Sequence, residues 1–213
     1  LDTFVDRRDV FARNRATHNL VHKFEAFCTF VLSGLETNPH MTVLTAATRL
    51  TNIQVSVILG SDSDVDLGNA AIKSLRGFDI KCELKVISAH RSPDVLVDYL
   101  KSSKERGCKA YIAIAGMAAH LAGAVAAHSS SPVLGVPTAH SLNGLDAILS
   151  TLQMPAGVPV ATFAAGTAGA TNAGIFAAQM LGVSDPSMAE KMVEFKKELR
   201  EKTIQKDKNL ARD

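Results

Sequence analysis

From residue 52 onward, short apolar segments alternate with segments of helical character, and this alternation constrains the fold more than any other feature. The apolar segments have the composition of buried strands and lie at residues 53–60, 80–88, 109–116, 131–137 and 157–166. The segments between and after them have helical spacing and lie at residues 66–78, 93–107, 118–130, 145–153 and 168–182. Strands that alternate with helices of about ten residues predict a parallel sheet.

The strand segments are almost continuously apolar, which is typical of strands covered by helices on both faces. Several helical segments are rich in Ala and Gly, so they can approach a sheet closely. The sequence therefore predicts a three-layer, doubly wound α/β domain of the flavodoxin-like type over residues 51–185. Residues 186–213 are charged but carry an apolar stripe, which predicts a helix packed on the domain or on a neighbouring subunit; the stripe consists of Met188, Met192, Phe195 and Leu199.

Residues 1–50 differ from the rest because charges of both signs are mixed through them without a repeating strand pattern. We interpret them as an N-terminal extension without an assigned role, disordered in part. The apolar stretch at residues 26–35 lies too far from a clear basic segment and has Glu25 at its edge, so a signal peptide is disfavoured.

Composition excludes several classes of function. The formal net charge of the 213 residues is +2, and no long basic stripe is present, so we expect no nucleic-acid partner. No apolar run reaches the roughly 18 residues of a membrane span, so we expect no membrane partner. The three cysteines, Cys28, Cys82 and Cys108, have no metal-binding or disulfide spacing, which predicts a protein of the reducing cytoplasm.

The first strand-to-helix turn is a candidate anion site. In an open parallel sheet, ligands bind outside the carboxyl ends of the strands, so the function is expected in these turns. Here Gly60 permits a tight turn, and Ser61 and Ser63 offer hydroxyl groups. The turn ends at Asp64, and free backbone N–H groups are expected where the next helix starts. This chemistry suits a phosphate or carboxylate. The alternative is an ordinary helix cap, because Ser and Asp are common capping residues.

The second turn places a histidine next to an arginine. Ser88 and Ala89 end the strand, His90 can give or take a proton near neutral pH, and Arg91 can bind a phosphate through two nitrogens. A solvated pair in a loop is the alternative. The expected position at the ligand-binding edge favours the functional interpretation.

The third turn is built from small residues, which leave room for a planar ligand beside the backbone. It contains Gly116, Ala118, Ala119, His120 and Leu121. Close packing of helix on sheet, with a structural histidine, is the alternative.

The turn at residues 164–172 is also composed mainly of small residues. The turns together predict a pocket that contacts its ligand largely through backbone groups. His128 and His140 have no comparable context and are interpreted as structural.

Six motifs occur in order between residues 55 and 181: GSDSD, SAHRSPD, AGMAAHLAG, PVLGVP, LQMPAGVPVAT and AGATNAGIFAAQML. Together they resemble the class I N5-carboxyaminoimidazole ribonucleotide mutase family of de novo purine biosynthesis. The resemblance implies a homo-octamer that moves a carboxylate from the exocyclic nitrogen N5 to ring carbon C4 of its substrate, without a metal or an organic cofactor. It also implies functional coupling to an ATP-dependent synthase that forms the N5 carbamate.

The resemblance also assigns roles to residues. Ser61 and Asp64 match substrate contacts, Arg91 matches the phosphate-binding arginine, and His90 matches the histidine of proton transfer. The positions that match the lining of the reacting base are Ser88, Ala89 and residues 116–121. Met117, Ala122 and Thr167 differ from the residues common at these positions in the family, and these differences bear on catalytic efficiency.

Two alternative functions remain. Direct carboxylation by CO2 is one, although the Ala-Ala-His-Leu turn is typical of the mutases and the Arg-Ser-Asn turn of the animal-type carboxylases is absent. The other is a non-catalytic, nucleotide-binding flavodoxin-like domain, for which His90 would not be needed.

Overall fold

The fold is built on a five-stranded, fully parallel sheet, as the strand-helix alternation predicted. The computed structural model describes residues 52–210, so the expectation for residues 1–50 lies outside the described part; the chain divides into two units after residue 50. The spatial order of the strands is β2-β1-β3-β4-β5. Their bounds are β1 Val55–Leu59, β2 Cys82–Val86, β3 Ala110–Ala115, β4 Val133–Pro137 and β5 Ala161–Thr162.

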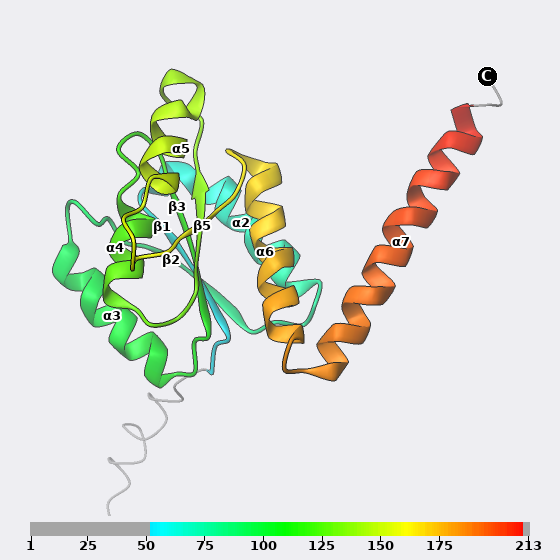
Figure 1. Cartoon of the computed structure of the whole chain (residues 1–213), viewed down its shortest axis with the longest axis horizontal. Coiled ribbons are helices and arrows are strands. Elements are labelled where there is room, and N and C mark those ends of the chain that lie inside the picture. Colours follow the sequence, from blue (N-terminus) through cyan, green and yellow to red (C-terminus); the bar gives the residue numbers. More distant parts are fainter. Residues whose placement is uncertain (1–51, 211–213) are drawn as a thin grey trace, which may run out of the picture. The chain divides into compact units, whose positions relative to one another are not determined.

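Helices cover both faces of the sheet and give three layers. In Figure 1, α2 and α6 lie on one side of the strands, and α3 and α4 lie on the other. The helices are α2 Val65–Arg76, α3 Pro93–Glu105, α4 Leu121–His128, α5 Leu145–Leu152, α6 Thr167–Gly182 and α7 Pro186–Leu210, with short 3-10 turns η1 Asp62–Asp64 and η2 Leu142–Gly144. Within residues 52–210, no helix combines the length and the apolar composition needed to cross a bilayer.

Strand β1 lies inside the sheet, between β2 and β3, and its side chains enter both cores. Val55, Val57 and Leu59 belong to the core under α2 and α6, whereas Ile58 belongs to the core under α3 and α4. Successive side chains of a strand point to opposite faces, so a strand in the middle layer must be apolar at nearly every position. This requirement explains the continuous apolar run in the sequence.

The topology places a crevice between β1 and β3. The chain passes from β1 to β2 in one direction, then returns across β1 to β3 and continues to β4 and β5. The strand order therefore reverses between β1 and β3, and ligands of doubly wound sheets bind at such a switch point. The residues after these two strands are the first and third turns of the sequence.

Helices α2 and α6 pack closely against each other, a contact that the sequence analysis did not predict. A Cβ on Gly174 would lie 2.8 Å from the Cβ of Ser74 on the facing helix, so a larger residue would separate the two helices. The hydroxyl of Ser74 donates to the Thr171 carbonyl at 3.1 Å, which fixes the same contact.

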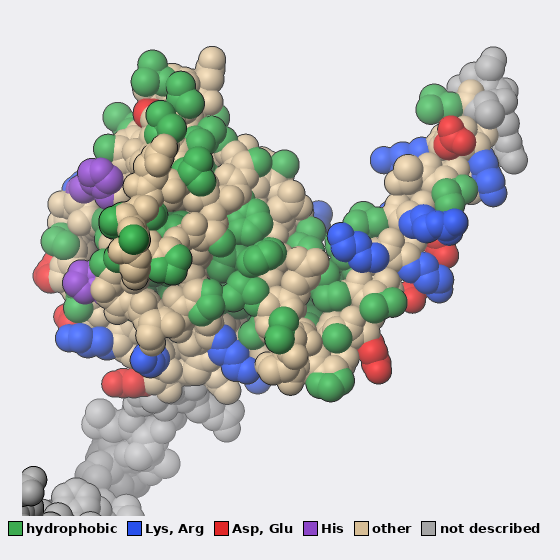
Figure 2. All heavy atoms as spheres, viewed as in Figure 1, with side chains coloured by type: hydrophobic (Ala, Val, Ile, Leu, Met, Phe, Trp, Pro, Cys, Tyr) green, Lys and Arg blue, Asp and Glu red, His purple; other side chains and the backbone are tan. Residues whose placement is uncertain are grey.

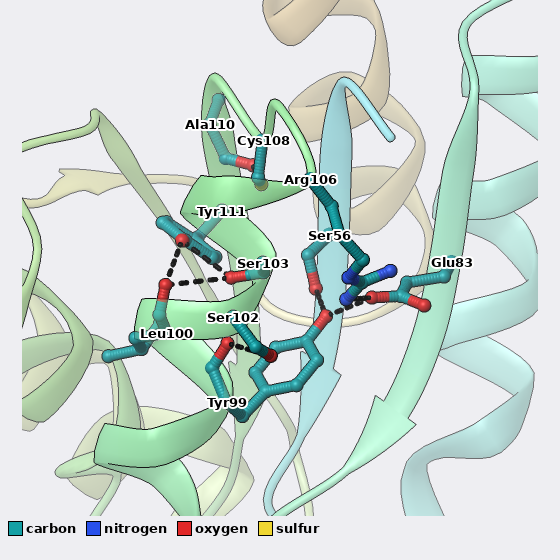
Figure 3. Close-up of polar contacts among 10 residues, drawn as sticks. All are labelled: Ser56, Glu83, Tyr99, Leu100, Ser102, Ser103, Arg106, Cys108, Ala110 and Tyr111. Carbon is teal, nitrogen blue, oxygen red and sulfur yellow. Dashed lines mark hydrogen bonds and ion pairs between the residues drawn. The ribbon is translucent and has the colours of Figure 1, made fainter. Parts of the chain in front are cut away.

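A buried polar network ties α3 to β1 and β2 (Figure 3). The Tyr99 hydroxyl donates to Glu83 Oε1 at 2.7 Å and accepts from the fully buried Ser56, while Arg106 pairs with the same carboxylate. Burial alone would raise the pKa of Glu83, but the hydrogen bonds from Arg106 and Tyr99 outweigh it and lower the pKa. Burial raises the pKa of Tyr99. The network is therefore an ionised Arg106–Glu83 pair, which a neutral phenol links to Ser56.

The last strand is much shorter than the predicted segment at residues 157–166, because β5 spans only Ala161–Thr162. Pro159 has no N–H for the ladder, and Gly157 has a φ of 95°, so regular pairing cannot begin earlier. After the strand, the Phe163 N–H donates to the Gly135 carbonyl at 2.9 Å and keeps the chain alongside β4.

Helix α7 packs on the domain only through its first turns. Met188 and Met192 are buried, and the Phe195 ring meets Phe78 edge-on with centroids 5.2 Å apart. Residues 200–210 are exposed, and this outer part of the helix extends away from α6 in Figure 1. Three of the four residues of the predicted apolar stripe therefore pack on the domain, whereas Leu199 is exposed.

Candidate active site

A cleft of about 450 Å³ lies at the carboxyl ends of the strands, where the switch point predicts it. All of the sequence-predicted site residues except Ala119 line it, and Ala119 is buried beside it. The lining residues are Gly60, Ser61, Ser63, Asp64, Ser88, Ala89, His90, Arg91, Ala115, Gly116, Met117, Ala118, His120, Leu121 and His140. The cleft has the size of ordinary small-molecule sites.

The first turn presents hydroxyl and N–H groups after β1. The Ser61 hydroxyl oxygen accepts from the Ser63 N–H at 3.4 Å and caps η1, which leads directly into α2. Gly60 does not adopt a left-handed backbone, so a tight turn is not the reason for glycine here. Its N–H donates to the Ile114 carbonyl at 2.9 Å, which joins the ends of β1 and β3.

The second turn is held against the first by Arg91. Nη2 of Arg91 donates to the Gly60 carbonyl at 3.2 Å, and the Arg91 N–H donates to the Ser88 hydroxyl oxygen at 3.2 Å. The remaining guanidinium N–H groups are free to meet a ligand, because the side chain is exposed and these are its only recorded bonds among residues 52–210. Arg91 is the one permanent cation among the described lining residues.

The two histidines of the second and third turns contact each other. His90 Nε2 and His120 Nδ1 lie 2.7 Å apart, and the rings meet edge-on. A hydrogen bond between two imidazole nitrogens needs one proton and one lone pair, so the contact holds a single proton. The pair therefore shares one proton between two side chains that line the cleft.

The third turn is a tight loop before α4, which begins at Leu121 and not at residue 118 as predicted. Met117 has a φ of 56°, and the Ala119 N–H donates to the Met117 carbonyl at 2.9 Å, so these residues are used for the loop. The Met117 side chain is 65% exposed and lines the cleft. Gly116 has no room for a Cβ, because Thr138 Oγ1 lies behind it.

His140 lines the cleft, although the sequence analysis treated it in the same way as His128. Its Nε2 lies 2.8 Å from Oδ1 of Asp64, whose side chain is only 3% exposed. His140 is therefore a lining residue of the cleft that the sequence analysis missed. The available signal was its position three residues after β4, at the same edge of the sheet.

The turn at residues 164–172 does not line the cleft, contrary to the prediction of a pocket made by three small-residue turns. Thr167 and Thr171 instead face a separate groove between α2, α6 and the start of α7. This turn follows β5 at the end of the sheet, two strands away from the switch point.

The cleft combines the groups needed to bind an anion and to move a proton. Arg91 and the N–H groups of the first turn offer positive charge, Asp64 accepts hydrogen bonds, and the histidine pair carries a proton. Within residues 52–210, no cluster of three or more His, Cys, Asp or Glu side chains has the arrangement of a metal site.

A doubly wound domain with a histidine pair and an arginine at its switch point has the architecture of an enzyme for a small anionic substrate. The chain belongs to the AIR carboxylase family, which residues 54–202 match. This agrees with the family resemblance that the six motifs indicated.

Several curated relatives carry the same name. The N5-carboxyaminoimidazole ribonucleotide mutase of Vibrio parahaemolyticus is 49% identical over 162 residues, which cover 76% of this chain and 100% of that protein. The mutases of Thermotoga maritima and Bacillus subtilis are 46% and 44% identical over 158 residues each, 74% of this chain and 91% and 98% of theirs. The crystal structure of Treponema denticola PurE superposes with a TM-score of 0.68 at 28% identity, covering 74% of this chain and 98% of that one.

Proposed function

We propose that the chain converts N5-carboxyaminoimidazole ribonucleotide to 4-carboxy-5-aminoimidazole ribonucleotide in de novo purine biosynthesis. It is an isomerase that transfers a carboxylate within one substrate. The observation that carries this assignment is the histidine pair next to Arg91 at the β1/β3 switch point, in a chain whose curated relatives are named for this reaction.

The charged groups of the cleft determine the orientation of the bound substrate. Arg91 and the N–H groups around Ser61 bind the 5′-phosphate, since a guanidinium and free N–H groups are the typical donors to phosphate. Asp64 accepts from the ribose hydroxyls, because a carboxylate repels phosphate but accepts from hydroxyl groups. The imidazole base then lies along the backbone of residues 116–121, close to His90.

His90 transfers the proton. In the reaction, the bond from N5 to the carboxylate carbon breaks, and a bond from C4 to that carbon forms. N5 gains a proton and C4 loses one, so no proton is consumed overall and one acid-base group can serve both steps. The single proton held between His90 and His120 suits this exchange.

The assignment is tested by following product formation through ultraviolet absorbance. The substrate is generated from aminoimidazole ribonucleotide, bicarbonate, ATP and a separate carbamate-forming synthase. We expect turnover that depends on the synthase and ATP. Product formed at the same rate from aminoimidazole ribonucleotide and bicarbonate alone would identify a direct carboxylase, and binding without any turnover would identify a non-catalytic nucleotide-binding domain.

The role of His90 is tested by His90→Asn. General acid-base groups contribute about 10²–10⁴-fold to rate, so the variant should bind ligand and lose nearly all turnover. His128→Asn is the matched control, because His128 is exposed at the end of α4 and outside the cleft. Wild-type turnover in His90→Asn would reject the proton-transfer role.

We infer that the protein is a homo-oligomer, and the family resemblance indicates an octamer. Figure 2 shows hydrophobic side chains gathered over α5 and α6 with few charges among them. On α5, three exposed leucines share a stripe at Leu145, Leu149 and Leu152. Exposed apolar surface that is contiguous in this way is typical of sites of protein–protein contact.

The groove beside α7 supports the same inference, because it measures about 960 Å³ and is open to a neighbour. Light scattering should give an oligomer for the full chain and for a chain that begins at Thr51. The second expectation rests on the Vibrio parahaemolyticus relative, which 162 residues of this chain cover completely. A stable, active monomer in either case would overturn the inference.

We also infer a cytoplasmic location and functional coupling to an ATP-dependent carboxyaminoimidazole ribonucleotide synthase. The two described cysteines, Cys82 and Cys108, are free, and burial raises the pKa of both thiols. Free thiols are typical of a reducing compartment. The synthase follows from the substrate, since an N5 carbamate must be formed before it can be rearranged. Fractionation of the native cells and mixing of the two purified enzymes test these points.

A further inference from the structure

The contact between His140 and Asp64 joins two parts of the sheet edge that are 76 residues apart in sequence. Asp64 ends the first turn, whereas His140 follows β4. Leu142, Asn143 and Gly144 beyond it have φ angles of 44°, 54° and 83°, so the chain turns sharply after bringing the histidine to the cleft. Such conformations cost non-glycine residues free energy and persist only where surrounding structure maintains them.

The chemistry of the contact fixes the proton. An ionised carboxylate can only accept hydrogen bonds, so Nε2 of His140 must carry the hydrogen that lies between it and Oδ1 of Asp64. Among residues 52–210, His140 is the one side chain recorded as donating to this carboxylate. Asp64 is nearly buried, and a buried charge without a donor is strongly disfavoured.

We propose that His140 is a positioning residue: it orients the Asp64 carboxylate in the cleft through Oδ1, which leaves Oδ2 to accept from hydroxyl groups of the ligand. The proposal rests on the proposed function for the identity of the ligand, a ribonucleotide. It assigns to His140 a part in ligand affinity and none in the proton transfer, which belongs to the His90–His120 pair across the cleft.

The test separates affinity from chemistry in the full-length protein. His140→Leu removes the donor, and we expect the KM to rise about tenfold or more while kcat changes by less than about twofold, because hydrogen bonds to charged groups are among the stronger ones. His140→Gln restores a donor and should recover most of the affinity. His128→Leu is the matched control, since it makes the same exchange at an exposed site away from the cleft.

A double-mutant cycle then asks whether His140 acts through Asp64. In the Asp64→Asn background, His140→Leu should have little further effect on the KM, because the charge that it orients is gone. Equal effects of His140→Leu in both backgrounds, or an unchanged KM in the single variant, would overturn the proposal. A wild-type protein without mutase activity would instead overturn the proposed function, so the two failures are distinct.

Discussion

Gly116 and Gly60 make a matched pair for testing how tightly the cleft floor is built. Both line the cleft at the end of a central strand, and neither has a left-handed backbone. A Cβ on Gly60 would meet the Ala115 Cβ at 3.4 Å, an ordinary contact. A Cβ on Gly116 would lie far inside contact distance of Thr138 Oγ1.

Thr138 cannot easily move aside. It is 1% exposed, its N–H donates to the Ala115 carbonyl at 3.0 Å, and rotating its β-branched side chain would bring a methyl group toward the same space. Overpacking of this kind costs about 1–3 kcal/mol. With a urea dependence of about 2 kcal/mol per molar, Gly116→Ala should lower the unfolding midpoint by about 0.5–1.5 M. Gly60→Ala should leave it nearly unchanged.

The assay is urea unfolding at one fixed protein concentration, because an oligomer's stability depends on concentration. Thr138→Ala removes the obstructing oxygen, which has no hydrogen-bond partner among the described residues. In that background Gly116→Ala should cost at least about 1 kcal/mol less than in the wild type. Equal losses from Gly60→Ala and Gly116→Ala, or no relief from Thr138→Ala, would refute the reasoning.

Three further predictions concern the buried network and the phosphate site. Tyr99→Phe leaves the Ser56 hydroxyl without its Tyr99 partner and should lower the free energy of unfolding by about 1–3 kcal/mol in urea titrations. An unchanged unfolding midpoint would show that this network does not stabilise the fold. The lowered pKa of Glu83 stabilises the fold at pH values above the ordinary carboxyl pKa, and this stabilisation is lost as the pH falls through the lowered pKa. Glu83→Gln should therefore make the free energy of unfolding fall less steeply on the acid side. An equally steep fall would contradict this. Arg91→Ala should weaken binding of the ribonucleotide about 10- to 100-fold in calorimetry and that of the dephosphorylated nucleoside much less; equal weakening would place the phosphate elsewhere.

The sequence predicted the parallel α/β fold because burial on both faces imposes an unmistakable pattern on each strand. In β1, Ser56 is the one polar residue among Val55, Val57 and Ile58. The structure shows why the rest are apolar, because alternate side chains enter two different cores. The same reasoning predicted where ligand groups should lie, since every turn after a parallel strand reaches one edge. The motif set then added the family, which residues 54–202 confirm.

Local pattern failed where long-range contacts decide conformation. The turn at residues 164–172 resembles the third turn in composition but lies beyond β5, and the extent of β5 depended on a proline and on pairing with β4. The place of each turn along the sheet edge is a property of strand order, which composition does not encode.

The sequence by itself determined the layers of this protein and the sheet edge where its turns meet, and it singled out His90 and Arg91 as candidates for proton transfer and phosphate binding. Only the tertiary structure decided which side chains meet there: His90 with His120, and His140 with Asp64. The physical reason is that hydrophobic periodicity is read within a single segment, whereas a hydrogen bond of 2.7 or 2.8 Å between distant turns depends on how the strands are ordered and how each loop leaves the sheet.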